Sequence, residues 1–421
     1  MTTTARLRTT ARRTGADHLT RAVGRHAGTA YLLSKGYGRL PDLRRAAGGP
    51  EAVAVRMLGR RMVALHGPRA VEFFYDERNV RRAVHTLDGA PRRERKALLM
   101  TVLSDPDRVG LLVERVREEW ERAAAHWPER EPVVLFDETA RILARAVCGW
   151  AGVPSYGTHE TTARDLVAMV DGFASMGPRR LRARRARKRQ EVRLTSLIEE
   201  LRYAGVPSGR TTPAQAVAAH RTADGGRLTP HTGAVELLDI LRHVVAVAWF
   251  VTFAAHALHR WPQHRVVLTE DEGREEYARA VAEEVRRFYP FVPFLGGVAV
   301  ADTWWDDVPV VAGDAVLLDV YGHHHDPELW PQPYVFDPDR FLGPADTGGP
   351  DLLIPQGGGD PTTGHRCPGE DITLAVLTAL VPRLARLPHT VPEQDLTIPL
   401  NRIPTRPRSG YVMTDVRPEN D

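Results

Sequence analysis

Apolar residues recur at three- and four-residue spacing over much of the chain, and this spacing is typical of one face of an α-helix. From about residue 17 to residue 287 the pattern predicts mainly helices punctuated by glycine and proline. Short apolar runs predict a few strands. The clearest predicted helices are 113–127, 137–150, 234–259 and 370–386, and the predicted strands are 61–66, 297–301 and 315–318. The pattern therefore predicts a mainly α fold with small β-sheets.

The chain contains no internal repeat and no linker that would separate two cores, so residues 17–421 are expected to form a single domain. Residues 1–16 carry cations without a following apolar segment, which predicts a mobile tail rather than a secretory signal. The longest apolar stretch, 244–255, is shorter than the roughly 18 residues typical of a membrane span. No membrane span is therefore expected.

The net charge bears on the binding partners of the protein, and the cysteine content bears on its cellular compartment. The 57 Lys and Arg residues against 53 Asp and Glu residues give a net charge of only +4, so nucleic-acid binding is not expected. Cys148 and Cys367 lie far apart and match neither a disulfide framework nor a zinc spacing, which favours a reducing cytoplasm. The arginine run at 179–189 is the densest charge block. It is interpreted mainly as a solvated face, with contact to an anionic partner as the alternative.

The second cysteine lies in the segment GGGDPTTGHRCPGE, directly before a predicted helix. Glycines let the backbone wrap closely round the sulfur of Cys367, and a helix N-terminus favours a thiolate. His365 and Arg366 add cationic character. The residues alone leave three interpretations open: a metal ligand, a nucleophile with a histidine base, or a structural cysteine. Zinc is disfavoured because no second cysteine or close Cys/His pair accompanies Cys367.

The Arg-Cys-Pro-Gly sequence after a glycine-rich loop resembles the haem-thiolate loop of the cytochrome P450 superfamily. Two further motifs match that superfamily in order. Glu284 and Arg287 resemble its ExxR pair, and Arg340 in FDPDRF resembles the arginine that completes the triad. The resemblance implies the cytochrome P450 fold, with Cys367 as the axial iron ligand of haem b.

The loop departs from the common superfamily pattern, because Asp360 stands where most members have phenylalanine. In this and other segments the chain is similar to the bacterial fatty-acid peroxygenases and decarboxylases. The resemblance also implies that His365, Arg92 and Lys96 contact haem propionates, although Arg92 stands where members often have histidine. The matching segments are 148–154, 169–180, 236–242, 319–330 and 391–396.

The helix that handles oxygen in ordinary members carries an acid followed by threonine, whereas this chain has Leu-Arg-His-Val at 241–244. A buried arginine there requires an anion. One candidate partner of Arg242 is Asp239, three residues earlier. The other, implied by the resemblance, is the carboxylate of a substrate, which a guanidinium binds in bidentate fashion. That carboxylate would then serve as the acid-base group for hydrogen peroxide.

The resemblance assigns further residues to the pocket. His85 matches a position above the haem where histidine is associated with decarboxylation and glutamine with hydroxylation; the alternative is a solvent-facing loop histidine. Val170, Phe173 and Phe294 are expected to line the pocket, or else to belong to the core. Two departures bear on the substrate. His243 replaces the usual proline after the anchoring arginine, and residues 77–87 are shorter than in the branch.

The sequence and its resemblance together predict a cytoplasmic haem-thiolate enzyme that uses hydrogen peroxide to hydroxylate or decarboxylate a carboxylic acid such as a fatty acid. The resemblance implies that Arg242 and His85 are its catalytic residues. No redox partner is then required. The first alternative is a conventional dioxygen-dependent monooxygenase with external electron partners. The second is a haem-binding protein without turnover, in which Arg242 only pairs with Asp239.

Overall fold

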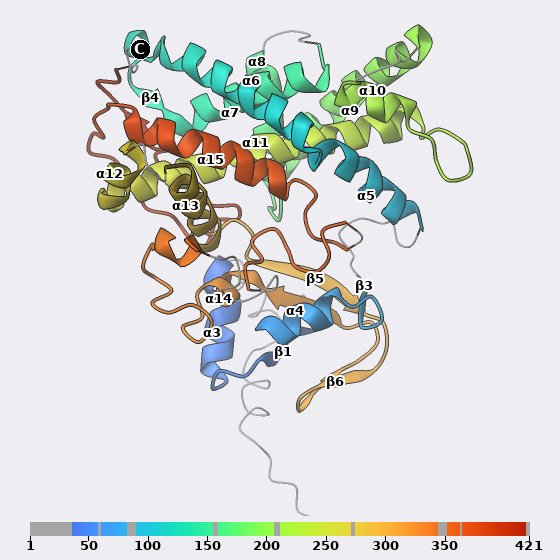
Figure 1. Ribbon diagram of the computed structural model, residues 1–421. Coiled ribbons are helices and arrows are strands. Elements are labelled where there is room, and N and C mark those ends of the chain that lie inside the picture. Colours follow the sequence, from blue (N-terminus) through green and yellow to red (C-terminus); the bar gives the residue numbers. More distant parts are fainter. Residues whose placement is uncertain are drawn as a thin grey trace, which may run out of the picture.

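A computed structural model describes residues 36–57, 60–81, 90–154, 159–205, 211–270, 274–343, 352–362 and 364–417. Helices dominate the structure and gather at one end, while a small sheet lies at the other end (Figure 1). The expected class, mainly α with small β-sheets, is confirmed. The predicted N-terminal tail, residues 1–16, lies outside the described residues.

The helical part contains most of the long elements (Figure 1). Its helices are α5 (Ala90–Leu103), α6 (Pro106–Ala124), α7 (Leu135–Ala151), α8 (His159–Asp171), α9 (Pro178–Ala204), α10 (Pro213–Ala219), α11 (Pro230–Arg260), α12 (Gln263–Thr269), α13 (Arg274–Phe288) and α15 (Glu370–Arg386). The other helical segments are α3 (Arg39–Ala46), α4 (Pro68–Tyr75), α14 (Val320–His324), η1 (Gly36–Gly38), η2 (Trp127–Glu129) and η3 (Pro338–Phe341).

The main sheet has five strands in the order β1-β2-β8-β5-β3. β2 and β8 pair in parallel, with Leu65 opposite Leu318, and the other neighbours pair antiparallel. The three predicted strands correspond to β2, β5 and β8. The strands are β1 (Ala52–Met57), β2 (Arg60–Leu65), β3 (Val80–Arg81), β4 (Val133–Val134), β5 (Phe294–Ala299), β6 (Thr303–Trp305), β7 (Val308–Val310), β8 (Ala315–Asp319) and β9 (Val412–Met413).

Helix α11 runs through the middle of the helical part and organises its core (Figure 1). The Thr229 side chain caps its first turn by accepting a hydrogen bond from the Thr232 N–H at 3.0 Å. The helix is long and apolar enough to cross a membrane, but 78% of its most apolar window is buried inside the protein. Burial on all sides explains the composition, as expected for a core helix.

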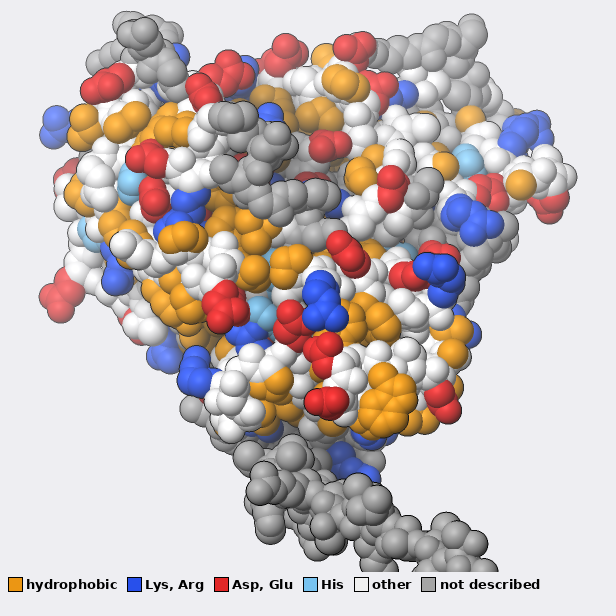
Figure 2. Space-filling model, turned by 60° about the horizontal axis from the view of Figure 1, so that its bottom comes forward, with side chains coloured by type: hydrophobic (Ala, Val, Ile, Leu, Met, Phe, Trp, Pro, Cys, Tyr) orange, Lys and Arg blue, Asp and Glu red, His pale blue; other side chains and the backbone are white. Residues whose placement is uncertain are grey.

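Charged side chains of both signs are interspersed with apolar ones on the face toward the sheet end (Figure 2). A surface that binds nucleic acids carries a cluster of Lys and Arg side chains. Among the described residues on this face, no such surface is seen.

Asp319 joins the sheet to α14 and is buried. Its Oδ1 accepts a hydrogen bond from the Gly322 N–H at 2.9 Å. Burial, with a further contribution from Asp326, raises the pKa of Asp319 to about 7. The folded protein therefore retains a proton that the unfolded chain releases near pH 4. The stabilisation from this protonated form is complete below the unfolded pKa and is lost as the pH rises through about 7.

Replacing Asp319 by asparagine, which mimics the protonated acid, is expected to flatten this dependence. Between about pH 6 and about pH 8, the unfolding free energy of the wild type should fall by about 1 kcal/mol relative to Asp319→Asn. Denaturant titrations at the two pH values measure this difference. Asp302→Asn is the control, because Asp302 is exposed and also accepts a backbone N–H, from Ala312 at 2.8 Å. Equal pH slopes for wild type and Asp319→Asn would contradict the assignment.

Candidate active site

The loop before α15 wraps round Cys367 with tight backbone turns. The Cys367 N–H donates to the Gln356 carbonyl at 2.9 Å, so the cysteine is tied to the residue just before Gly357. Gly357 and Gly359 have φ of +97° and +72°. A Cβ on Gly359 would lie 2.8 Å from Cδ1 of Tyr75, which comes from α4. Both the backbone conformation and this close approach therefore require glycine.

Substituting Gly359 by alanine is expected to lower the free energy of unfolding by about 2 to 3 kcal/mol, because left-handed strain adds to the clash with Tyr75. Gly49→Ala separates the two causes. Gly49 has φ +84° and no atom within 4 Å of an added Cβ, so only strain of about 1 kcal/mol is expected. Loosening of the loop should also speed alkylation of Cys367 by a thiol reagent. Cys148 is buried, so its alkylation should stay slow and the measured rate reports on Cys367. Equal losses in both variants would rule out a steric role for Tyr75.

The sulfur of Cys367 lies against His243 of α11. An ideal Cβ on Gly369 would be 3.8 Å from Sγ and 3.4 Å from the His243 Cβ, so the helix and loop are closely packed. The Nδ1–H of His243 donates to the Asp239 carbonyl at 2.6 Å, which orients the ring. The sulfur and the His243 ring form a side-chain hydrogen bond.

This environment favours a thiolate. Burial alone would raise the pKa of the Cys367 thiol, but the charge and hydrogen bond of His243 and the Gly369 N–H lower it below its ordinary value. Burial alone would lower the pKa of His243, but the charge and hydrogen bond of Cys367 raise it. Both shifts stabilise a thiolate beside a protonated imidazole. Burial raises the pKa of the other cysteine, Cys148, to about 11, so that thiol stays neutral.

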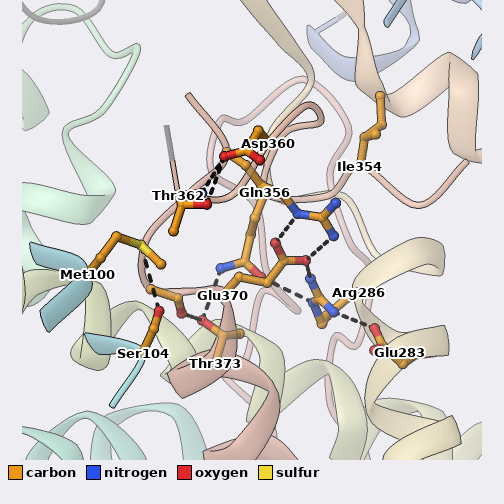
Figure 3. Close-up of polar contacts among 12 residues, drawn as sticks. Met100, Ser104, Glu283, Arg286, Ile354, Gln356, Asp360, Thr362, Glu370 and Thr373 are labelled. Carbon is orange, nitrogen blue, oxygen red and sulfur yellow. Dashed lines mark hydrogen bonds and ion pairs between the residues drawn. The ribbon is translucent and has the colours of Figure 1, made fainter. Parts of the chain in front are cut away.

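A polar network behind the loop fixes both of its ends (Figure 3). Arg286 of α13 has only 1% of its side chain exposed and forms an ion pair with Glu370 at the start of α15. Its Nε donates to Oε1 of Gln356 at 3.1 Å. Gln356 Nε2 donates to Thr373 Oγ1 at 3.1 Å, and Arg366 Nε donates to Glu370 at 2.5 Å. One guanidinium therefore holds the residues on either side of the cysteine.

Glu284 and Arg287 form a fully buried ion pair on α13. Arg287 Nε and Nη2 donate to the two carboxylate oxygens of Glu284 at 2.6 and 2.7 Å. Arg287 Nη1 also donates to the His324 carbonyl at 2.7 Å. Arg340 of η3 approaches Glu284 at 3.8 Å. The structure thus brings together the three residues of the predicted triad.

Arg242 projects from α11 into a pocket of about 300 Å³ between α8, α9 and α11. Its Nη2 donates to Asp239 Oδ1 at 2.8 Å, with 25% of the arginine and 20% of the aspartate side chain exposed. The adjacent residue, His243, is the one that contacts Cys367. The pocket is lined by Met169, Gly172, Phe173, Ala174, Arg180, Ala183, Arg184, Arg187, Leu238, Asp239 and Arg242. A cation at the wall of a partly apolar pocket can bind a carboxylate.

Comparison with known proteins identifies the family. A profile of cytochrome P450 matches residues 259–401. The chain is similar to cytochrome P450SP alpha (CYP152B1), solved in complex with (R)-ibuprofen, with a TM-score of 0.87 and 36% sequence identity over 93% of this chain and 99% of that one. The chain belongs to the cytochrome P450 family.

Two further comparisons place the chain within the P450 family. A variant of cytochrome P450 OleT in complex with arachidonic acid superposes with a TM-score of 0.88 and 32% identity, covering 94% of this chain and 97% of that one. P450SP alpha and OleT represent the fatty-acid peroxygenase and decarboxylase branch, to which the chain therefore belongs. The predicted P450 fold is confirmed.

Curated P450 relatives match over shorter segments. Cyclooctat-9-en-7-ol 5-monooxygenase of Streptomyces melanosporofaciens is 29% identical over 257 residues, covering 55% of this chain and 52% of that protein. Human cytochrome P450 4A11 is 33% identical over 138 residues, covering 32% of this chain and 25% of that protein. The matches thus span about a quarter to a half of the length of these two relatives.

The donor set at Cys367 suits the haem that P450 membership implies. A single sulfur with a lowered pKa lies in a glycine-rich turn, as a thiolate ligand requires. The buried Lys96 side chain of α5 donates to the Arg366 carbonyl, and His365 Nε2 lies 3.6 Å from Glu77 Oε1. Lys96 therefore contacts the loop from α5, and His365 lies in the loop itself. The His243 ring contacts the same sulfur, so iron can bind there only if this ring moves aside.

Of the remaining predicted site residues, only some line the pocket. Phe173 lines the pocket and is 54% exposed, whereas Val170 is buried in the helical core. Phe294 lies on β5 and packs with the cluster of Leu40 and Leu317 at the sheet end, apart from the residues that line the pocket. Its position follows from the pairing of β5 with β8. His85 lies outside the described residues, as does the side chain of Arg92.

Sequence reasoning missed the contribution of Arg286 and the pocket arginines of α9. Arg286 carries a signal in hindsight, because it is a second arginine directly beside the triad arginine, at the end of the buried face of α13. Arg180 and Arg184 carried none beyond membership of a charged run. A larger cleft of about 490 Å³ between the end of α11 and residues 394–397 lies away from Cys367 and Arg242.

Proposed function

We propose that this protein is a haem-thiolate peroxygenase that oxidises a carboxylic acid at the expense of hydrogen peroxide. One observation carries the proposal: Arg242 opens into a pocket, and the next residue along α11 contacts the cysteine sulfur. Arg242 and His243 are consecutive residues of α11, so an acid held by Arg242 would lie on the same turn of the helix that contacts the sulfur. The ibuprofen complex of P450SP alpha and the arachidonic acid complex of OleT support an acid as the substrate.

In this proposal the Cys367 sulfur would hold the iron of haem b, and Lys96, His365 and Arg92 would bind its propionates. The bound haem would supply activation of peroxide, with electron donation from the thiolate favouring cleavage of the O–O bond. Behind the loop, Arg286 and Gln356 hold the cysteine backbone in place. Against the effect of burial, His243 and the Gly369 N–H lower the pKa of Cys367 in the haem-free protein, which favours a thiolate before the haem binds.

In this proposal Arg242 releases the carboxylate of Asp239 and binds the carboxylate of the substrate instead. In the ligand-free protein it is paired with Asp239 at 2.8 Å, and an incoming acid would compete for the same guanidinium. Helix α11 has no acid-alcohol pair at 241–244, so the bound carboxylate supplies the missing proton acceptor and donor. Anchoring also fixes which C–H bonds are in reach, namely those at the α and β carbons.

The overall reaction balances without an electron partner. Hydroxylation inserts one oxygen atom of hydrogen peroxide into a C–H bond and releases one water. Oxidative decarboxylation converts the acid and hydrogen peroxide into a terminal alkene, carbon dioxide and two waters. We assign His85 to the choice between these products, with histidine favouring decarboxylation. A cytoplasmic location is part of the proposal, since both cysteines are free in the structure.

The proposal is tested with the haem-loaded protein, hydrogen peroxide and a panel of straight-chain and aryl carboxylic acids, without any reductase. Hydroxy acids or terminal alkenes, identified by mass spectrometry, are the expected products. Turnover only with dioxygen and an electron-transfer system would instead indicate a conventional monooxygenase. Acid-induced changes in the haem spectrum without any turnover would indicate a haem protein that binds but does not oxidise its ligand.

A further inference from the structure

The arginine run on α9 divides into groups with different environments. Two of its members are held by acids of the neighbouring helix α8. Arg179 Nε lies 3.0 Å from Asp171 Oδ2, and Arg189 Nε lies 3.2 Å from Asp165 Oδ2. These pairs bind the two helices together, so their positive charges are neutralised and belong to the scaffold.

A second group points toward the pocket. Arg180, Arg184 and Arg187 are spaced by four and three residues, which places them on one face of α9. All three line the same pocket as Arg242. Arg187 is paired with Glu191 on its own helix at 2.6 Å. For Arg180 and Arg184, the described residues supply no hydrogen-bond or ion-pair partner.

The pocket therefore carries more positive charge than its own acids can neutralise. Four guanidinium groups line it, and two of them are paired, Arg242 with Asp239 and Arg187 with Glu191. Among the described residues, the exposed Arg180 and Arg184 have no such countercharge. Like charges that share a small volume repel each other, and an anion between them removes this cost. Ala183 lies between Arg180 and Arg184 in sequence and packs closely against Gly172, since an ideal Cβ on that glycine would clash with the Ala183 Cβ. The apolar part of the lining is formed by Met169, Phe173 and Leu238.

We propose that the pocket selects acids that carry a second anionic group, of the α,ω-dicarboxylate class. One carboxylate binds Arg242, the other binds Arg180 and Arg184, and the chain between them lies against the apolar lining. This inference rests on the proposed function for the first carboxylate only. A volume of about 300 Å³ is at the lower end for ligand pockets, which suits a short diacid better than a long-chain fatty acid.

The test compares octanoic acid with octanedioic acid, two acids of equal length that differ only in the second carboxylate. Binding to the haem-loaded protein is measured by isothermal titration calorimetry, which requires no turnover. The diacid is expected to bind roughly ten-fold more tightly, since two partly exposed charge pairs contribute about 1 to 2 kcal/mol together. The double variant Arg180→Gln, Arg184→Gln should bring the ratio of the two affinities close to one, because any general loss of attraction for anions affects both acids alike.

Arg182→Gln with Arg185→Gln is the matched control. It removes the same charge from the same helix, at positions that do not line the pocket. Loss of the diacid preference in both double variants would show a general charge effect and overturn the proposal. Equal affinity for the two acids would overturn it as well, while leaving Arg242 as the anchor of a simple carboxylic acid. If neither acid binds, both this inference and the proposed function fail.

Discussion

Replacing Arg287 by alanine is expected to lower the free energy of unfolding by about 3 to 5 kcal/mol. Arg287 and Glu284 are completely buried, and the two groups share a bidentate ion pair. Removing the guanidinium leaves a carboxylate without its countercharge in the protein interior. It also leaves the carbonyl groups of His324 and Pro333 without a donor. Denaturant titration of the haem-free and haem-loaded protein measures the loss.

A double-mutant cycle separates the interaction energy between Glu284 and Arg287 from the free-energy cost of burying each charge. Glu284→Leu combined with Arg287→Met should cost clearly less than the sum of the two single substitutions, because the single ones strand a buried charge. Arg45→Ala is the matched control. Arg45 also pairs with an acid three residues away, Asp42 at 3.0 Å, but its side chain is 71% exposed. A change within about 0.5 kcal/mol is expected there. Additive losses in the cycle would contradict a buried, coupled pair.

The helical part of the fold could be predicted because its pattern is local. The apolar spacing of 234–259 indicates a buried helix, and α11 spans Pro230–Arg260. The start of this helix was missed because it depends on the cap formed by Thr229, which lies outside the apolar run. Strands β3, β4 and β9 have two residues each and exist only through long-range pairing. No window of sequence carries enough signal to predict them.

The same distinction applies to the candidate site. Cys367 with its glycines, and Glu284 with Arg287, are recognisable because each motif is contiguous or lies on one helical turn. The surroundings of Phe294 depend on the antiparallel register of β5 with β8, where Phe294 lies opposite Asp319. The network of Arg286 joins residues 70 and 84 positions away, so only the folded chain reveals it.

Arg242 is the residue for which sequence left two partners open. The structure shows the pair with Asp239 in the ligand-free protein and also shows that the guanidinium faces a pocket. The two observations are compatible, because a carboxylate ligand would replace Asp239 rather than add to it. The two interpretations nevertheless predict opposite effects when Asp239 is changed, and this difference makes them separable by experiment.

Replacing Arg242 by alanine is expected to reduce kcat/KM for carboxylic acids with hydrogen peroxide by roughly a hundred-fold or more, the loss of a charge-assisted bidentate contact of about 3 kcal/mol. Asp239→Asn should do the reverse and tighten acid binding several-fold, since it removes the competing carboxylate while keeping the backbone carbonyl that orients His243. Spectral titration of the haem-loaded variants with one acid measures affinity, and peroxide-driven product formation measures turnover.

The outcome for Asp239→Asn distinguishes the anchor from the structural pair. If Arg242 served only to pair with Asp239, each single substitution would strand one partly buried charge, and both would lower stability alike without a specific effect on acids. If Arg242 is the anchor, the two variants shift acid affinity in opposite directions. Weaker acid binding by Asp239→Asn, at unchanged thermal stability, would contradict the proposed exchange of carboxylates and would require another role for Arg242.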